Sequence, residues 1–190
     1  MTAVASAGIR RGVPGALLGM ILFITSEIMF FGGLFGAYLS LRAGSDDWPP
    51  EGIEVERSIP IVLTLVLLTS SVTVHLASKA AHRRDQAGVR RAVTLTVALG
   101  LLFLAGQAFE YSRLDFAIED GAYATTFFAT TGFHGLHVLV GVVILALGFL
   151  QVGRREADPR SLGQVEAASY YWHFVDAIWI LVFTVIYLIQ

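Results

Sequence analysis

Five long apolar segments limit what this chain of 190 residues can fold into. Each holds about 20 or more mostly apolar residues, the length that an α-helix needs to cross the ~30 Å hydrocarbon core of a bilayer. The gaps between them carry most of the prolines and charges and are too short for a soluble domain. The sequence therefore predicts an all-α fold, a single membrane domain over residues 1–190, with transmembrane helices at about 14–41, 59–80, 92–112, 125–151 and 168–189.

The composition agrees with a membrane protein. Hydrophobic residues make up 55% of the chain and charged residues only 15%, whereas a soluble domain is about 25% charged. The chain has no cysteine, so it forms neither disulfides nor cysteine-ligated zinc or iron–sulfur sites.

The basic residues predict an orientation. The N-terminal tail, the second gap and the fourth gap together carry ten Lys and Arg residues, and the opposite side carries only three, Arg42, Arg57 and Arg113. Because basic residues collect on the cytoplasmic side, we expect the N-terminus in the cytoplasm and the C-terminus outside. The outer gaps are acidic instead, a topology signal that would also suit a basic partner.

Seven ionisable side chains lie inside the predicted spans: Glu27, Glu110, Asp176, His75, His134, His137 and His173. A charged group at the bilayer centre costs at least ~3 kcal/mol, so each is a candidate functional residue in need of a partner. At ~1.5 Å of rise per residue, Glu27 falls level with His134, and His137 falls level with Asp176. We therefore expect Glu27 to be protonated or tightly paired, with His134 as its candidate partner.

The histidines allow two interpretations. His75 and His173 fall at one depth on different helices, as the ligands of a haem would, and His134 and His137 share a helix face that a metal site with Glu27 could use. Alternatively, the imidazoles form hydrogen bonds that pack the bundle or hold a lipid headgroup. No set of three strong ligands at one depth is evident from the sequence.

Small and aromatic residues suggest how the helices associate. Gly32 and Gly36, and likewise Gly141 and Gly148, share helix faces on which another backbone can approach closely, within the bundle or in another subunit. The aromatic residues 170–172 open the last span, where we expect them to act as an interfacial anchor.

Several motifs together carry a family resemblance. ILFITSEIMFFGGLFGAYL (21–39), WPP (48–50), GQAFEY (106–111), DGAYATTFFATTGFHGLHVLVG (120–141) and YYWHFVDAIWILVF (170–183) follow one another along almost the whole chain. They resemble subunit III of the haem–copper cytochrome c oxidases, in the five-helix bacterial form that begins at the third helix of the longer seven-helix form.

The resemblance implies an accessory role in aerobic respiration. Subunit III holds no redox centre, so we expect no cofactor in this chain, with haem a and copper in partner subunits I and II of a proton-pumping aa3- or caa3-type oxidase. It also implies a bacterial plasma-membrane location, bound phospholipid, support of proton uptake and turnover, and a possible respiratory supercomplex; nucleic acid is not among the expected partners. Glu27 matches the family's buried glutamate in the motif SE-x-x-FF, and polar interior positions are matched by His134, His137, His173 and Asp176.

The sequence is also compatible with other functions. The chain could serve a quinol oxidase or a nitric oxide reductase, which a partner subunit II lacking a copper-binding cysteine pair would indicate. It could also be a haem-binding electron carrier that uses His75 and His173, which a Soret band from the purified chain would indicate.

Overall fold

The computed structural model describes residues 15–53, 55–152 and 159–189. In these ranges the secondary structure is helical and includes no strand. The elements are α1 (Gly15–Ala43), α2 (Ser58–His82), α3 (Gln86–Tyr111), α4 (Ala122–Val152), α5 (Pro159–Phe183) and a π-helical turn, Thr184–Leu188, that continues α5. Five helices are long and apolar enough to cross a membrane, which confirms the predicted fold class.

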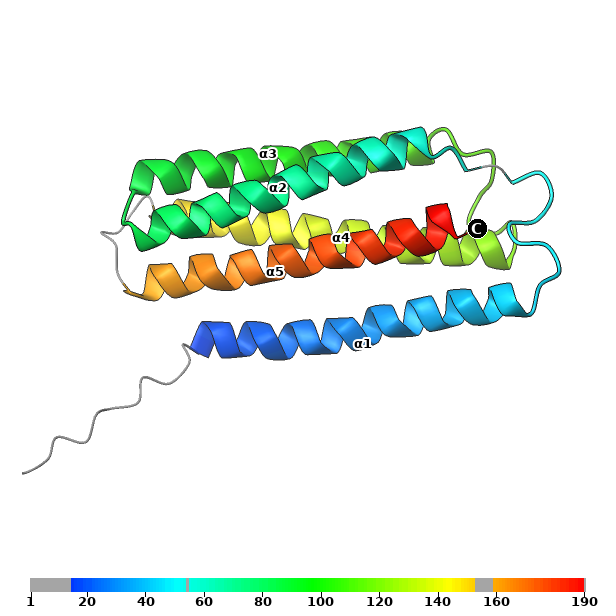
Figure 1. Ribbon diagram of the computed structural model, residues 1–190, viewed down its shortest axis with the longest axis horizontal. Helices are drawn as coiled ribbons and strands as arrows, with labels where there is room; N and C mark the ends of the chain where they lie inside the picture. The colour runs from blue at the N-terminus through cyan, green and yellow to red at the C-terminus, as the bar shows by residue number, and fades with distance from the viewer. Residues whose placement is uncertain (1–14, 54, 153–158, 190) are drawn as a thin grey trace, which may run out of the picture.

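The helices lie side by side and run alternately in opposite directions (Figure 1). The α2–α3 turn lies at one end of the bundle, together with the start of α1 and of α5, and the loops that follow α1 and α3 lie at the other. The first end, which we call the basic end, carries Lys79, Arg83, Arg84, Arg90 and Arg91 around the α2–α3 turn.

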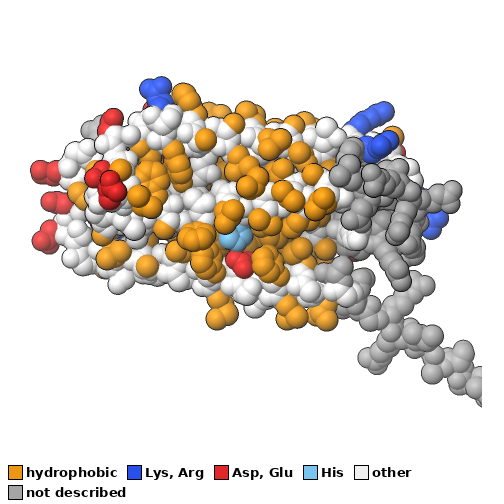
Figure 2. All heavy atoms as spheres, turned by 180° about the vertical axis from the view of Figure 1, so that it is seen from behind, with side chains coloured by type: hydrophobic (Ala, Val, Ile, Leu, Met, Phe, Trp, Pro, Cys, Tyr) orange, Lys and Arg blue, Asp and Glu red, His pale blue; other side chains and the backbone are white. Residues whose placement is uncertain are grey.

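The other end, which we call the acidic end, carries the acidic residues of the loops after α1 and α3. Figure 2 shows one face, on which acidic side chains gather at one end with a basic side chain above them, more Lys and Arg side chains lie at the other end, and a broad apolar belt lies between.

Trp172 of α5 joins four helices in the core. Its side chain is fully buried, and its indole N–H donates a hydrogen bond to Ser70 Oγ of α2 at 2.9 Å. The ring fills the space beside two glycines: a Cβ on Gly100 of α3 would lie 2.7 Å from it, and a Cβ on Gly141 of α4 would lie 2.9 Å from it. Since interiors pack as densely as organic crystals, these glycines leave room for a ring that a larger residue would displace.

Helix α1 lies at the edge of the bundle and packs on α4 and α5 (Figure 1). Phe31 and Tyr38 bury their side chains on its inner side. By contrast, a Cβ on Gly32 or Gly36 would meet no atom within 4 Å. At Gly141 the neighbour is the Trp172 ring rather than another backbone, and a Cβ on Gly148 would also meet no atom within 4 Å. The α1 glycines face outward.

Helix α5 begins at Pro159, about nine residues before the predicted start. The predicted interfacial anchor is consequently wrong for Tyr171 and Trp172, which lie several turns into the helix and are buried in the core. Tyr170 alone of the three remains exposed, at 54%. Proline suits a helix start because it lacks the N–H that would be left unbonded there, and this signal marks the boundary better than hydropathy does.

Candidate functional site

Glu27 of α1 and His137 of α4 meet near the middle of the bundle. Glu27 Oε2 lies 2.9 Å from His137 Nε2, and the side chains are only 18% and 12% exposed, respectively. The imidazole is bracketed by Phe30 and Phe31, whose ring centroids lie 6.2 and 5.0 Å away. Figure 2 shows a histidine and an acidic side chain together in the middle of the apolar belt.

The hydrogen bonds of His137 determine how many protons the pair holds. His137 Nδ1 lies 2.6 Å from the Phe133 carbonyl oxygen, which only accepts hydrogen bonds, so Nδ1 carries a proton. The contact between Nε2 and Glu27 therefore contains one further proton, held either as imidazolium and carboxylate or as imidazole and carboxylic acid. Both forms have no net charge, which makes the pair tolerable at this depth.

The predicted pairing of Glu27 with His134 is wrong. His134 is fully buried on another face of α4, between Phe103 and Trp179, whose ring centroids lie 5.6 and 4.8 Å away. Neither ring nitrogen of His134 forms a hydrogen bond within the described part of the chain. A step of three residues turns a helix by about 300°, which leaves the two side chains about 60° apart around the helix axis. His134 and His137 can therefore face different neighbouring helices.

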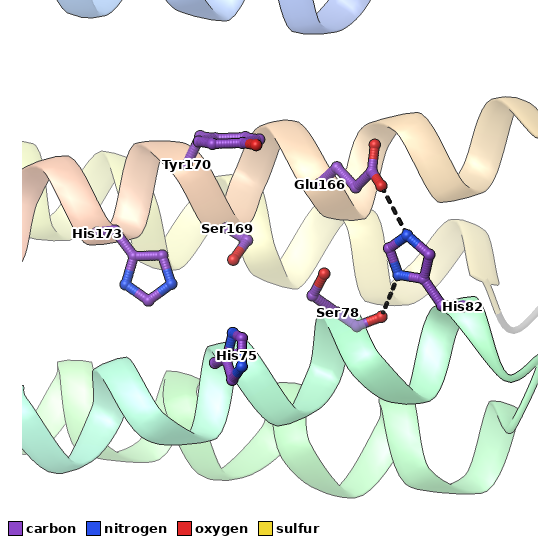
Figure 3. A pocket seen from close by; sticks show the side chains of 7 residues that line it. All are labelled: His75, Ser78, His82, Glu166, Ser169, Tyr170 and His173. Carbon is purple, nitrogen blue, oxygen red and sulfur yellow. Dashed lines mark hydrogen bonds and ion pairs between the residues drawn. The ribbon is translucent and has the colours of Figure 1, made fainter.

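The predicted pairing of His137 with Asp176 is also wrong. Asp176 is buried at 5% exposure and lies beside Ser71 of α2, although neither carboxylate oxygen forms a well-directed hydrogen bond to a described residue. Ser71 Oγ lies 2.8 Å from His173 Nδ1. His173 and His75 line one cavity of about 270 Å³ between α5 and α2 (Figure 3), as their equal predicted depths suggested.

Glu110 near the end of α3 has a partner that the sequence did not reveal. Tyr187, in the π-helical turn, donates its hydroxyl hydrogen to Glu110 Oε1 at 2.9 Å, and both side chains are buried. The hydroxyl of Tyr171 similarly donates to the His137 carbonyl oxygen at 3.0 Å. The sequence predicts an interfacial position for Tyr171, yet a buried tyrosine usually finds a hydrogen-bond partner for its hydroxyl.

These features define a polytopic α-helical membrane protein with a partly buried acid–imidazole pair between α1 and α4. Residues 6–190 match the family model described as Cytochrome c oxidase subunit III. The chain belongs to this family.

Curated relatives agree over most of the chain. The "Cytochrome c oxidase subunit 3" of Thermostichus vulcanus is 42% identical over 175 residues, which cover 91% of this chain and 87% of the relative. The protein of the same name from Corynebacterium diphtheriae is 40% identical over 179 residues, with the same coverage. The "Probable cytochrome c oxidase subunit 3" of Mycobacterium bovis is 41% identical over 177 residues, again with this coverage.

Proposed function

We propose that this chain is the non-catalytic subunit III of a proton-pumping, aa3- or caa3-type cytochrome c oxidase in a bacterial plasma membrane. The observation that carries the proposal is the family match over residues 6–190, together with relatives of that name at about 40% identity. In this proposal haem a and copper belong to subunits I and II, and this chain supports their proton uptake and sustained turnover.

The outward face of α1 supports a role as a subunit. Gly32, Gly33 and Gly36 leave a shallow strip on which no atom of this chain would touch an added Cβ within 4 Å. Small residues allow transmembrane helices of different subunits to approach closely. We assign this strip to contact with subunit I, and the apolar belt around it to contact with subunit I and phospholipid.

The Glu27–His137 pair supports a role in stability rather than catalysis. Its net charge stays at zero whichever group holds the proton, so it joins α1 to α4 without a charge in the bilayer. In the proposed orientation the basic end faces the cytoplasm, since the sequence segments before the first, third and fifth spans carry ten of the thirteen Lys and Arg residues.

The test compares the oxidase purified with and without this chain. We expect the same initial rate of oxygen reduction and a shorter active lifetime during turnover when the chain is missing. In the complete complex, Glu27→Gln should leave assembly and the initial rate largely intact. Loss of oxygen reduction from the first turnover, in either preparation, would contradict the accessory role.

A further inference from the structure

Helices α2 and α5 face each other with polar residues along half their length. On α2 these residues are Ser71, His75, Ser78 and His82, and their spacing of four, three and four places them on one helix face. The facing positions of α5 are also polar, and they are Glu166, Ser169, Tyr170, His173 and Asp176. We call these two rows the polar seam.

The polar seam begins at the basic end. His82 Nε2 lies 2.9 Å from Glu166 Oε1, and both side chains are partly exposed to solvent. Behind this pair lies the cavity of about 270 Å³ (Figure 3), lined by the imidazoles and serine hydroxyls of both helices. A cavity of this size, lined by polar side chains, has room for several water molecules, because one needs only about 10–15 Å³ of such volume.

The polar seam ends at a buried acid near the middle of the membrane. From His82 to Ser71 the helix rises about 16 Å, roughly half of a ~30 Å hydrocarbon core. Ser71 contacts His173 Nδ1 at 2.8 Å on one side and lies beside Asp176 on the other. A carboxyl group buried at this depth, with no charged partner among the described residues, calls for an explanation.

Beyond Asp176 the interface between α2 and α5 is closed. Leu67 of α2 and Trp179 of α5 are each only 1% exposed, and the Trp179 indole N–H donates to Thr64 Oγ1 at 2.9 Å. The polar seam is therefore open at the basic end and ends at Asp176. It reaches from one side of the membrane to about the middle of the bilayer and does not cross it.

We propose that the polar seam lets Asp176 exchange protons with the water at the basic end. The relay starts from the His173 tautomer that carries its proton on Nδ1. A proton from the cavity binds Nε2, the Nδ1 proton passes to Ser71 Oγ, and the serine hydroxyl turns and gives its own proton to the Asp176 carboxylate. One proton leaves the cavity and one reaches the carboxylate, so the step balances. The closed half of the interface prevents the seam from conducting protons across the membrane.

This inference goes beyond the proposed function and uses residues on the opposite side of α5 from α1. The test uses the native membrane complex. If the complex is intact but the polar seam is inaccessible to water, this inference is overturned and the proposed function is not affected.

The absence of cysteine from the chain permits a direct test of water access. Ser71→Cys and Ser78→Cys are nearly isosteric probes inside the polar seam. Val72→Cys and Leu76→Cys are matched controls on the outward face of α2, where the native side chains are 60% and 51% exposed. A membrane-impermeant, ionic thiol reagent is applied to each side of the membrane in turn, and modification is followed by mass spectrometry of this subunit.

We expect both seam cysteines to react from the basic-end side at least about tenfold faster than the controls, because the reagent needs water and a thiolate. Equal rates in seam and control positions, no reaction at either seam position, or reaction from the acidic-end side only would overturn the proposal.

Proton exchange itself is followed by infrared spectroscopy in D2O. The carbonyl band that disappears in Asp176→Asn identifies the acid. His173→Phe removes the nitrogen that contacts Ser71 and should slow deuteration of this band about tenfold, the effect of losing roughly one hydrogen-bonded link. His134→Phe, which removes a fully buried imidazole outside the polar seam, is the control and should leave the rate unchanged. The same rate in both variants would contradict the relay.

Discussion

From the geometry of the Glu27–His137 contact we predict how much stability is lost when His137 is replaced. His137→Leu keeps most of the side-chain volume but removes the imidazole that pairs with a carboxyl group only 18% exposed. A buried polar group left without a partner costs about 1–3 kcal/mol, so we expect a loss of about 2 kcal/mol. That corresponds to a roughly thirtyfold change in the unfolding equilibrium.

Two companion variants separate pairing from packing. In Glu27→Gln the side-chain amide can donate to His137 Nε2 while Nδ1 still donates to the Phe133 carbonyl oxygen, so stability should change by less than about 1 kcal/mol. The double variant Glu27→Leu with His137→Leu replaces both partners by apolar groups and should recover most of the loss.

The assay is unfolding of the chain in lipid nanodiscs by a denaturing detergent, followed by tryptophan fluorescence. The expected order of stability places Glu27→Gln and the double variant close to the unsubstituted chain, with His137→Leu clearly below both. If His137→Leu were as stable as Glu27→Gln, or the double variant less stable than His137→Leu, the pairing argument would be refuted.

Three further predictions concern packing and assembly. Gly141→Ala should destabilise the isolated chain by about 1–3 kcal/mol through overpacking against Trp172, whereas Gly32→Ala, which meets no atom within 4 Å, should have no effect in the same unfolding assay. Tyr187→Phe should cost about 1–3 kcal/mol, because Glu110 Oε1 loses its hydroxyl donor; an unchanged thermal midpoint would contradict this. Gly32→Leu should leave the isolated chain equally stable but reduce its recovery in the purified oxidase, and full recovery would argue against the assigned contact with subunit I.

The sequence was sufficient to predict the number of helices, because the apolar length that spans a bilayer is a strong physical requirement. It also placed His75 and His173 at one depth, and they line the same cavity. Depth along a helix axis is available from residue counting alone.

The direction in which each side chain points was not predictable in the same way. His134 and His137 are about one helical turn apart on α4, and they face different helices. Counting residues along the helix gives depth only, so it could not identify which of the two pairs with Glu27. The same limit hid Ser71, whose place beside His173 and Asp176 depends on how α2 and α5 are rotated against each other. Amphipathic patterns fix such rotations in soluble bundles, but a chain that is apolar on nearly every face leaves them to packing.

Affinity purification of the native complex through a tag on this chain would decide whether the chain is an oxidase subunit. We expect subunits I and II, with haem a and copper, to co-purify with it, and the chain isolated and supplied with haem to show no Soret band. A partner subunit II with a copper-binding cysteine pair would identify cytochrome c as the electron donor. Recovery of the chain without haem-bearing partners, or a Soret band from the chain alone, would contradict its assignment as an accessory oxidase subunit.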